Sequence, residues 1–345
     1  MQRFVAMAVA AVLAGVALAV PARADTSAEE PLFQLWLNNY RAAAIARGLP
    51  PAWLEVALAG VRLDAMALRL DRAQPDASAK PASFSQYLAA KFRGDRVALG
   101  RRQLEANSTT LASASARSGV PAQVIAAVWG IETSYGRVTG DHDLVAALAT
   151  LTYDGRRRAL FERELDAAVR MVGEGHVTRS AMRGSWAGAF GQLQFLPSSY
   201  LAYGRDGDGD GRVDVWRSLP DVFSSIGAYL GEHGWQGQKW GFAVVLPLAL
   251  DRSQIANDGT PAASCPASLA RHSRQMSASQ WQQLGVILPS GAWPADDVPL
   301  SLIEPEGPGG NAFLTTPAFR ALLSYNCSNY YAISLGLLSD ALVAP

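Results

Sequence analysis

The sequence predicts a mainly α-helical protein with a small β-containing insert. Between residues 32 and 236, apolar residues recur at helical spacing and are interrupted by Gly- and Pro-containing connections. The segment WGFAVVLPLAL, residues 240–250, is instead rich in β-branched and aromatic residues, and clusters of Pro, Gly, Asp and Ser follow it to about residue 310. Helical spacing returns in residues 311–345. We therefore expect a β region at 237–310 between two helical parts.

The length and composition support a folded protein with a sizeable core. The chain has 345 residues, of which 49% are hydrophobic and 17% charged, which suits one large domain or two smaller ones. Its 30 basic and 30 acidic residues balance, and no excess of positive charge points to nucleic acid as a partner.

The first 24 residues have the pattern of a secretory signal peptide. Arg3 provides a basic start, residues 4–20 are apolar, and Ala22-Arg23-Ala24 has the small residues of a cleavage site. The alternative is a retained membrane anchor, because the apolar run is near the lower length limit for spanning a bilayer. We expect cleavage after Ala24 and export of the mature protein. No cysteine follows the apolar run to carry a lipid anchor.

Residues 32–118 form the first predicted helical region. A helical hairpin is expected where the apolar pattern is broken by Gly48-Leu49-Pro50-Pro51. Residues 71–83, DRAQPDASAKPAS, are polar and contain proline, which indicates a loop. Helical patterning resumes from about residue 84 to 118.

Glu132 lies within an apolar helical segment. Pro121 suits the first turn of a helix, and the stretch AQVIAAVWGIE continues it. Counting back from Glu132 by three, four and seven residues reaches Trp129, Val128 and Ile125, so the carboxyl group shares its face with apolar side chains. Burial raises the pKa of a carboxylic acid, which is the condition for a general acid near neutral pH.

A structural role for Glu132 is the alternative. A glutamate at a helix end can form an ion pair, and Arg137, Arg156, Arg157 and Arg158 are the nearest candidates in the sequence. Because structural ion pairs are commoner than catalytic acids, periodicity alone leaves both interpretations open.

The segment RDGDGDGRVDVW has the first half of a calcium-binding loop. Asp206, Asp208 and Asp210 alternate with glycines, and Gly211 occupies the sixth position. Oxygen ligands at alternate positions followed by a glycine turn are typical of EF-hand loops. The twelfth position is Arg217, where such a loop has a bidentate glutamate. A metal-free, solvated turn is therefore the alternative.

The chain has two cysteines, Cys265 and Cys327. An even pair in an exported protein can form a disulfide. The two cysteines are 62 positions apart, and closing a loop of that length stabilises a fold by about 4 kcal/mol in the chain-entropy model. Two reduced, buried thiols are the alternative.

Four ordered blocks carry a resemblance to a known family. They are VPAQVIAAVWGIETSYGRVTG, AALATLTYDGRRRALFERELDAAV, GSWAGAFGQLQFLPSSYLAYGRDGDGDGRVDVW and YNCSNYYAISL. Together they resemble the lytic murein transglycosylase B family of periplasmic enzymes, over roughly residues 32–340. The resemblance implies a lysozyme-like helical catalytic core at 119–236 that includes the metal loop, an additional helical region before it, a small β domain at 237–310 and a helical return to the core at 311–345.

The family cleaves the β-1,4 bond between N-acetylmuramic acid and N-acetylglucosamine and leaves a 1,6-anhydro ring. Its single catalytic acid/base matches Glu132. Glycosidases that use water ordinarily need two carboxyl groups, whereas here the sugar's own 6-hydroxyl is the nucleophile and one group suffices. A muramidase that hydrolyses the same bond and a non-catalytic peptidoglycan-binding protein are the alternatives.

The resemblance also implies supporting residues. Ser185 matches the residue that orients the glutamate, and Gln194 matches a substrate-contacting amide. The remaining positions that match the family's sugar cleft are Tyr229, Tyr325, Asn326 and Tyr331. Each could instead be an interior residue with its polar tip satisfied. Ala228 departs from the family, which usually has asparagine before this tyrosine.

The metal loop resembles the family's elongated version, whose closing carboxylate comes later in the sequence. Asp221 is the candidate for that carboxylate, and the Arg212 carbonyl is the candidate at the seventh position. We expect structural Ca²⁺ and no cofactor for catalysis. Cys327 replaces a usual polar residue, which favours a disulfide to Cys265 that ties the β insert to the core. The implied partners are peptidoglycan glycan strands, with cell-wall synthases as further candidates, and the chain is expected to be a monomer.

Overall fold

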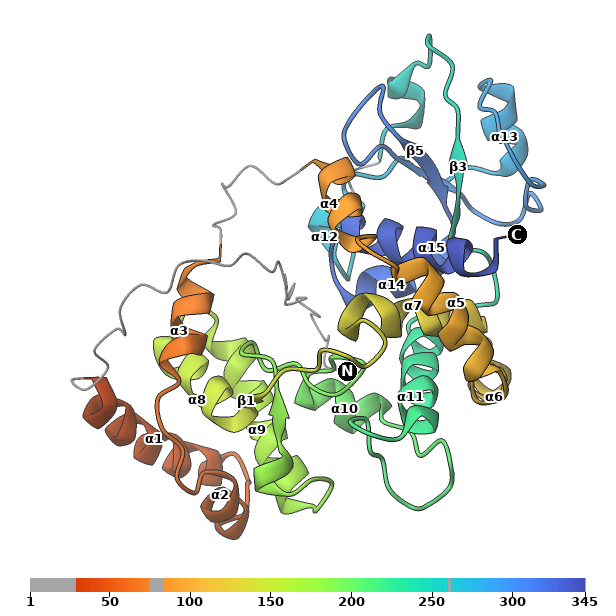
Figure 1. Cartoon of the computed structure of the whole chain (residues 1–345). Helices are drawn as coiled ribbons and strands as arrows, with labels where there is room; N and C mark the ends of the chain where they lie inside the picture. The colour runs from red at the N-terminus through yellow and green to blue at the C-terminus, as the bar shows by residue number, and fades with distance from the viewer. Residues whose placement is uncertain (1–28, 75–82, 258, 260–261, 345) are drawn as a thin grey trace. The chain divides into compact units, whose positions relative to one another are not determined.

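The computed structural model describes residues 29–74, 83–257, 259 and 262–344, and the predicted signal peptide lies outside these ranges. The described residues form two compact units, each built from two segments of the chain. Unit 1 comprises residues 83–131 and 226–344, and unit 2 comprises residues 29–74 and 132–225. The predicted mainly helical fold is confirmed (Figure 1).

Unit 2 is helical apart from one pair of two-residue strands. Its elements are α1 (Glu29–Ala46), α2 (Pro51–Ala57), α3 (Ala65–Arg72), β1 (His142–Asp143), α8 (Leu144–Asp154), α9 (Arg158–Gly173), a 3₁₀ turn (Arg179–Ala181), β2 (Arg183–Gly184) and α10 (Pro197–Tyr203). The predicted break at Gly48 separates α1 from α2, because Gly48 adopts a φ of 98°.

Helix α8 forms the centre of unit 2. All residues from Leu144 to Thr152 are buried, and α1, α3 and α9 pack against this helix. Asp143 caps its first turn by accepting a hydrogen bond from the Ala146 N–H at 3.1 Å, and Gly155 ends it in the left-handed conformation. Burial on all sides explains why the segment from Leu144 to Thr152 contains no charged residue.

Unit 1 combines helices with a three-stranded sheet. Its helices are α4 (Phe84–Lys91), α5 (Arg96–Ala106), α6 (Ser108–Ser118), α12 (Pro266–Leu269), α13 (Ala278–Gln283), α14 (Pro317–Tyr325) and α15 (Asn329–Val343), and a 3₁₀ turn spans Arg252–Ile255. Helices α4, α5 and α14 pack against α15, which is largely buried (Figure 1). Two helices, α7 (Ala122–Thr133) and α11 (Leu219–Glu232), begin in one unit and end in the other.

The sheet of unit 1 has the order β3-β5-β4 and is antiparallel throughout. Its strands are β3 (Gly241–Val244), β4 (Ser301–Ile303) and β5 (Ala312–Thr315), and Thr315 pairs with both Gly241 and Ser301. Behind the sheet lies a core that includes Trp281, Leu300 and Leu314, each fully buried. The Trp281 indole N–H donates to the Leu300 carbonyl at 3.2 Å, which satisfies its buried donor.

The β region differs in detail from the sequence expectation. Its central strand β5 lies beyond residue 310, in the part expected to be helical, and two short helices, α12 and α13, lie inside the predicted β region. The segment AFLT is only four residues long and buried throughout, so it has no alternation to distinguish it from a helical turn.

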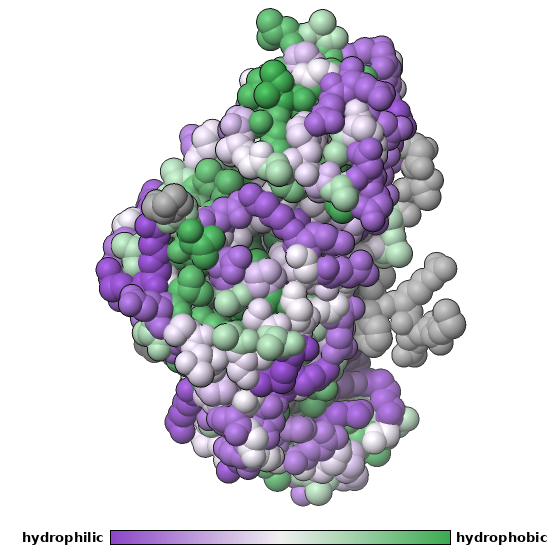
Figure 2. All heavy atoms as spheres, turned by 90° about the vertical axis from the view of Figure 1, so that its right-hand side faces the viewer, coloured by the Kyte–Doolittle hydropathy of each residue, from purple (hydrophilic) through white to green (hydrophobic). Residues whose placement is uncertain are grey.

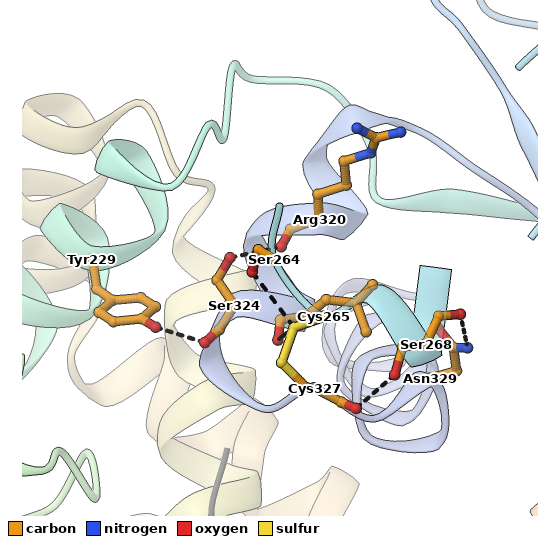
Figure 3. The surroundings of a disulfide bond; sticks show 9 residues. Tyr229, Ser264, Cys265, Ser268, Arg320, Ser324, Cys327 and Asn329 are labelled. Atoms are coloured by element: carbon orange, nitrogen blue, oxygen red, sulfur yellow. Dashed lines mark hydrogen bonds between the residues drawn. A yellow bond between two sulfur atoms is a disulfide. The ribbon is translucent and has the colours of Figure 1, made fainter. Parts of the chain in front are cut away.

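Cys265 and Cys327 form a disulfide with a Cα–Cα distance of 5.2 Å (Figure 3). Cys265 directly precedes α12, and Cys327 lies in the connection between α14 and α15. The Ser268 hydroxyl donates to the Cys327 carbonyl at 2.6 Å, and the Asn329 amide donates to the Ser268 carbonyl at 2.8 Å. These contacts attach the short helix α12 to the C-terminal helices.

No helix among the described residues combines the length and apolar character needed to cross a bilayer. The face drawn in Figure 2 mixes hydrophilic and hydrophobic side chains.

Candidate active site

Glu132 lies in the last turn of α7, a helix whose other side chains are mostly buried. Ile125 and Val128 are fully buried and Trp129 is 2% exposed, in agreement with the face predicted from the sequence. Glu132 itself is half-buried. The carboxyl group therefore stands at the end of an apolar helix, with part of its surface accessible.

The backbone that follows Glu132 adopts an uncommon conformation. Ser134 and Tyr135 have φ values of 52° and 62°, and Gly136 continues the run at 78°. Left-handed conformations in non-glycine residues cost on the order of 1 kcal/mol each and cluster at functional sites. The sequence gives no sign of this feature, since neither serine nor tyrosine favours a left-handed backbone.

Hydrogen bonds connect the end of α7 to the Gly-rich loop at 183–195. The Thr133 hydroxyl donates to the Gln192 carbonyl at 2.8 Å and accepts from the Gly136 N–H at 3.0 Å. The Gln194 amide donates to the Thr139 carbonyl at 3.1 Å and to the Gly191 carbonyl at 3.0 Å. Two of the predicted residues, Glu132 and Gln194, thus belong to segments that are bonded to each other within unit 2.

Ser185 lies at the start of a tight turn in the same loop. Its N–H donates to the Ala189 carbonyl at 2.7 Å, and its hydroxyl accepts from the Ala189 N–H at 3.0 Å. Gly188 has a φ of 87° at this turn, and an added Cβ there would overlap the Leu148 side chain. The sequence therefore needs glycine at 188 for both the conformation and the close packing.

Two of the four arginines considered as partners of Glu132 pair with a different carboxylate. Arg156 and Arg157 both form ion pairs with Asp71, whose carboxylate is 1% exposed. A buried carboxylate needs such compensation, so these two arginines stabilise unit 2 instead.

Of the predicted sugar-binding residues of unit 1, Tyr325 and Asn326 lie at the end of α14. Tyr229 is 6% exposed, and its hydroxyl donates to the Ser324 carbonyl at 2.7 Å (Figure 3). Its ring packs edge-on against Tyr325, with 4.9 Å between centroids. Tyr325 and Asn326 are half-buried, whereas Tyr331, at 3% exposed, belongs to the interior of α15. The Tyr229 ring therefore packs against the Tyr325 ring and supports it.

The Asp/Gly loop presents three exposed carboxylates. Oxygens of Asp206, Asp208 and Asp210 lie within 4.8 Å of one another. Hydrogen bonds from the Gly211 and Gly209 N–H groups lower the pKa of Asp206, so this carboxyl group is kept ionised. Ionised oxygens at this spacing are suitable ligands for a hard cation such as Ca²⁺.

Asp221 lies outside this carboxylate group. It is 1% exposed, and its oxygens accept hydrogen bonds from the Gly207 N–H at 2.8 Å and the Asp214 N–H at 2.6 Å. Asp221 therefore holds the two ends of the loop together, and its role as a metal ligand stays a prediction, as does that of the Arg212 carbonyl.

The sequence profile described as "Transglycosylase SLT domain" matches residues 32–340. The chain belongs to this family. The match covers both units, including every residue predicted for the active site and the metal loop.

One curated relative of this chain is the membrane-bound lytic murein transglycosylase B of Escherichia coli strain K12. It is 34% identical over 180 residues, which cover 50% of this chain and 50% of the relative. The matched part thus spans about half the length of the curated relative.

Two solved structures extend the likeness over most of the chain. SltB3 from Pseudomonas aeruginosa, in complex with NAG-anhNAM-pentapeptide, is 36% identical with a TM-score of 0.80, over 90% of this chain and 79% of that one. Escherichia coli Slt35, in complex with calcium, is 25% identical with a TM-score of 0.70, over 92% of this chain and 94% of that one. The lysozyme-like fold expected from the resemblance is confirmed by this agreement.

Proposed function

We propose that this protein is a peptidoglycan lytic transglycosylase. It would cleave the β-1,4 bond between N-acetylmuramic acid and N-acetylglucosamine and form a 1,6-anhydro ring on the muramic acid. The observation that carries the proposal is the placement of Glu132, a half-buried carboxyl group at the end of an apolar helix in a member of the transglycosylase family. The presence of an anhydro sugar in the SltB3 complex supports the product.

In the proposed reaction Glu132 acts twice. Its carboxylic acid first gives a proton to the glycosidic oxygen, and the C–O bond to the anomeric carbon breaks, so that N-acetylglucosamine leaves as an alcohol. The substrate's N-acetyl group stabilises the positive centre. The Glu132 carboxylate then takes the proton of the 6-hydroxyl as that oxygen attacks the anomeric carbon. The acid is regenerated and no water is consumed.

The loop at 183–195 supports this chemistry by fixing positions. Ser185 is held by its turn with Ala189, and we assign to it the orientation of the Glu132 carboxyl group. Gln194 has a φ of 53° and two backbone acceptors for its amide N–H groups, so its side-chain oxygen is held in one direction. We assign this amide to substrate binding.

The tyrosines predicted for sugar binding in unit 1 have two proposed roles: contact with the sugar, and support of the tyrosine that makes this contact. Tyr325 and Asn326 are half-buried and can contact a sugar, whereas Tyr229 and Tyr331 are more than nine-tenths buried. Since the Tyr229 hydroxyl already donates to Ser324, we assign to Tyr229 the support of the Tyr325 ring. An aromatic ring held in this way suits the face of a sugar.

The Asp/Gly loop is proposed to bind structural Ca²⁺ through Asp206, Asp208 and Asp210, with the Arg212 carbonyl and Asp221 as further ligands. The calcium complex of Slt35 supports this assignment for a related chain. The ion would add cross-links to the loop and takes no part in the proton transfers. We also propose peptidoglycan strands as the substrate, which the peptidoglycan fragments bound by SltB3 support. We propose a periplasmic location because the sequence begins with the pattern of a secretory signal peptide.

Digestion of purified sacculi tests the proposal. Mass spectrometry of the released muropeptides should find products lighter by one water than those of a muramidase, because the anhydro ring forms without hydrolysis. Glu132→Gln should lower the rate by a factor of at least about 10³, since it removes both proton-transfer steps.

Glu55→Gln, at an exposed position of α2, is the matched control and should retain the wild-type rate. Hydrated products would identify a muramidase. Unchanged activity in Glu132→Gln would remove the catalytic assignment, and wild-type binding of sacculi without any cleavage would favour a non-catalytic binding protein.

A further inference from the structure

Thr133, the residue that directly follows Glu132, joins α7 to the turn after it. Thr133 is 1% exposed, and its hydroxyl both donates to the Gln192 carbonyl at 2.8 Å and accepts from the Gly136 N–H at 3.0 Å. The Thr133 carbonyl accepts a further hydrogen bond, from the Val138 N–H at 3.0 Å. One buried residue thus closes the turn that ends α7 and connects this turn to a second segment of unit 2.

The turn held by Thr133 has a conformation that its residues do not favour. Ser134 and Tyr135 have left-handed φ values of 52° and 62°, which non-glycine residues keep only where the surrounding structure imposes them. The bond between the Gly136 N–H and the Thr133 hydroxyl is part of that surrounding structure. Without the hydroxyl, Ser134 and Tyr135 would return towards ordinary φ values, and the backbone next to Glu132 would turn with them.

Gln192 gives the Thr133 hydroxyl an acceptor in a fixed place. The Gln192 N–H donates to the Val215 carbonyl at 2.9 Å, and its side-chain amide donates to the Trp216 carbonyl at 3.0 Å. An added Cβ at Gly191 would lie 2.8 Å from the Val215 side chain, so close packing also holds the two segments together. Gln192 is therefore attached to the segment that follows the Asp/Gly loop.

Trp216 is itself held at two points. Its indole ring stacks on the fully buried Phe190, with 4.7 Å between centroids and 16° between the planes. Its Nε1–H donates to the Arg183 carbonyl at 3.0 Å. Side chains locked by packing and hydrogen bonds in this way can hold a neighbouring group in one geometry. The chain of contacts runs from Trp216 through Gln192 to Thr133, at the end of α7.

We propose that Thr133 and Gln192 are positioning residues that fix the direction of the Glu132 carboxyl group. The inference rests on the proposed function, in which this one group must reach first the glycosidic oxygen and then the 6-hydroxyl. A displacement of about 1 Å at a reacting group can lower the rate about a hundredfold. Because Thr133 and Gln192 act through Glu132 and not on the substrate, their loss should lower kcat and leave KM nearly unchanged.

Substitutions at two buried threonines test the role of the hydroxyl. Thr133→Val keeps the shape of the side chain and should lower kcat on sacculi at least about tenfold. Thr133→Ser retains a hydroxyl and should recover most of the wild-type kcat. Thr152→Val is the matched control, because Thr152 is also 1% exposed but its hydroxyl donates within α8, to the Leu148 carbonyl at 2.7 Å. Its kcat should equal that of the wild type.

Gln192→Met tests the other half of the pair. Methionine has a similar length but cannot donate to the Trp216 carbonyl, so kcat should fall several-fold while KM stays nearly constant. The double variant Thr133→Val/Gln192→Met should be about as slow as the slower single variant, because both changes break the same chain of contacts. Losses that multiply in the double variant would show that the two residues act independently, and would overturn the pairing.

Three kinetic results would contradict the proposal. They are a wild-type kcat in Thr133→Val, an equally low kcat in Thr133→Ser, and a loss in Thr133→Val that is confined to KM. If Thr133→Val does not fold, Gln192→Met decides in its place, and a wild-type kcat in that variant would overturn the proposal.

Crystal structures of the wild type and of Thr133→Val give a readout that does not depend on activity. In the variant, Ser134 and Tyr135 should leave the left-handed region, and the Glu132 carboxyl group should move by at least about 1 Å. An unmoved carboxyl group would overturn the positioning role. A wild-type protein that releases no muropeptides from sacculi refutes the proposed function, whereas the two structures still decide whether Thr133 fixes Glu132.

Discussion

Removal of the Cys265–Cys327 disulfide is expected to destabilise unit 1 strongly. The bond joins residues separated by 62 positions, and closing a loop of this length lowers the entropy of the unfolded chain by the equivalent of about 4 kcal/mol. Typical domains are stable by about 5–15 kcal/mol, so this is a large fraction of the total. The hydrogen bonds of Ser268 and Asn329 remain when the bond is removed, and they keep the native segment in place.

The test is guanidinium unfolding of the double variant Cys265→Ala/Cys327→Ala, without reductant. Trp281, fully buried in the core of the β region, makes fluorescence a suitable probe. The free energy of unfolding should fall by about 4 kcal/mol, and reduced wild type should behave in the same way. Ser264→Ala, next to the bond, is the control and should change the stability by less than about 0.5 kcal/mol.

A loss below about 1 kcal/mol in the double variant would refute the reasoning. It would mean that the ends of this segment already lie close together in the unfolded ensemble, so that the disulfide removes little entropy.

Three further outcomes follow from contacts in unit 2. The hydrogen bond of the half-buried His142 to Asp64 raises the pKa of His142 above 6.5. The stabilisation of the folded state by this bond is therefore complete below pH 6.5 and is lost as the pH rises through the raised pKa. His142→Gln should flatten the fall in unfolding free energy between pH 6 and 8, and an unchanged slope would contradict this. Gly188→Ala should cost about 1–3 kcal/mol more than Gly48→Ala in thermal unfolding, because both have positive φ but only position 188 lacks space for a Cβ. Calcium at about 100 times its Kd should stabilise the chelator-treated protein by about 2.7 kcal/mol, and Asp208→Asn should abolish the effect; equal melting temperatures with and without calcium would argue against the metal site.

The helices of the fold could be predicted from local patterns, since each depends on spacing and end signals within a few residues. The turn at Gly48 and the helix that follows Pro121 are examples. The division into two units could not be predicted in this way, because it depends on contacts between distant segments. The strand β5 was missed for a related reason: it is a strand because β3 and β4 pair with it, and its own four residues do not require it.

In the candidate site, too, the features that depend on local sequence could be predicted and those that depend on the surrounding structure could not. Glu132 and the carboxylate loop are visible in the sequence because residue type and spacing carry their chemistry. The left-handed conformations of Ser134 and Tyr135 are not visible, because surrounding structure imposes them against the residues' own preference.

The discontinuity of unit 1 has a consequence for how the chain acquires its structure. Arg101 in α5 donates to the Ala341 carbonyl across 240 positions of sequence, and the Ser85 hydroxyl donates to Glu306 across 221. Contacts of such high order slow folding, because a long stretch of chain must be closed before they form. Because a polypeptide is synthesised from its N-terminus, α5 cannot form its contact with Ala341 until a further 240 positions of the chain have been made.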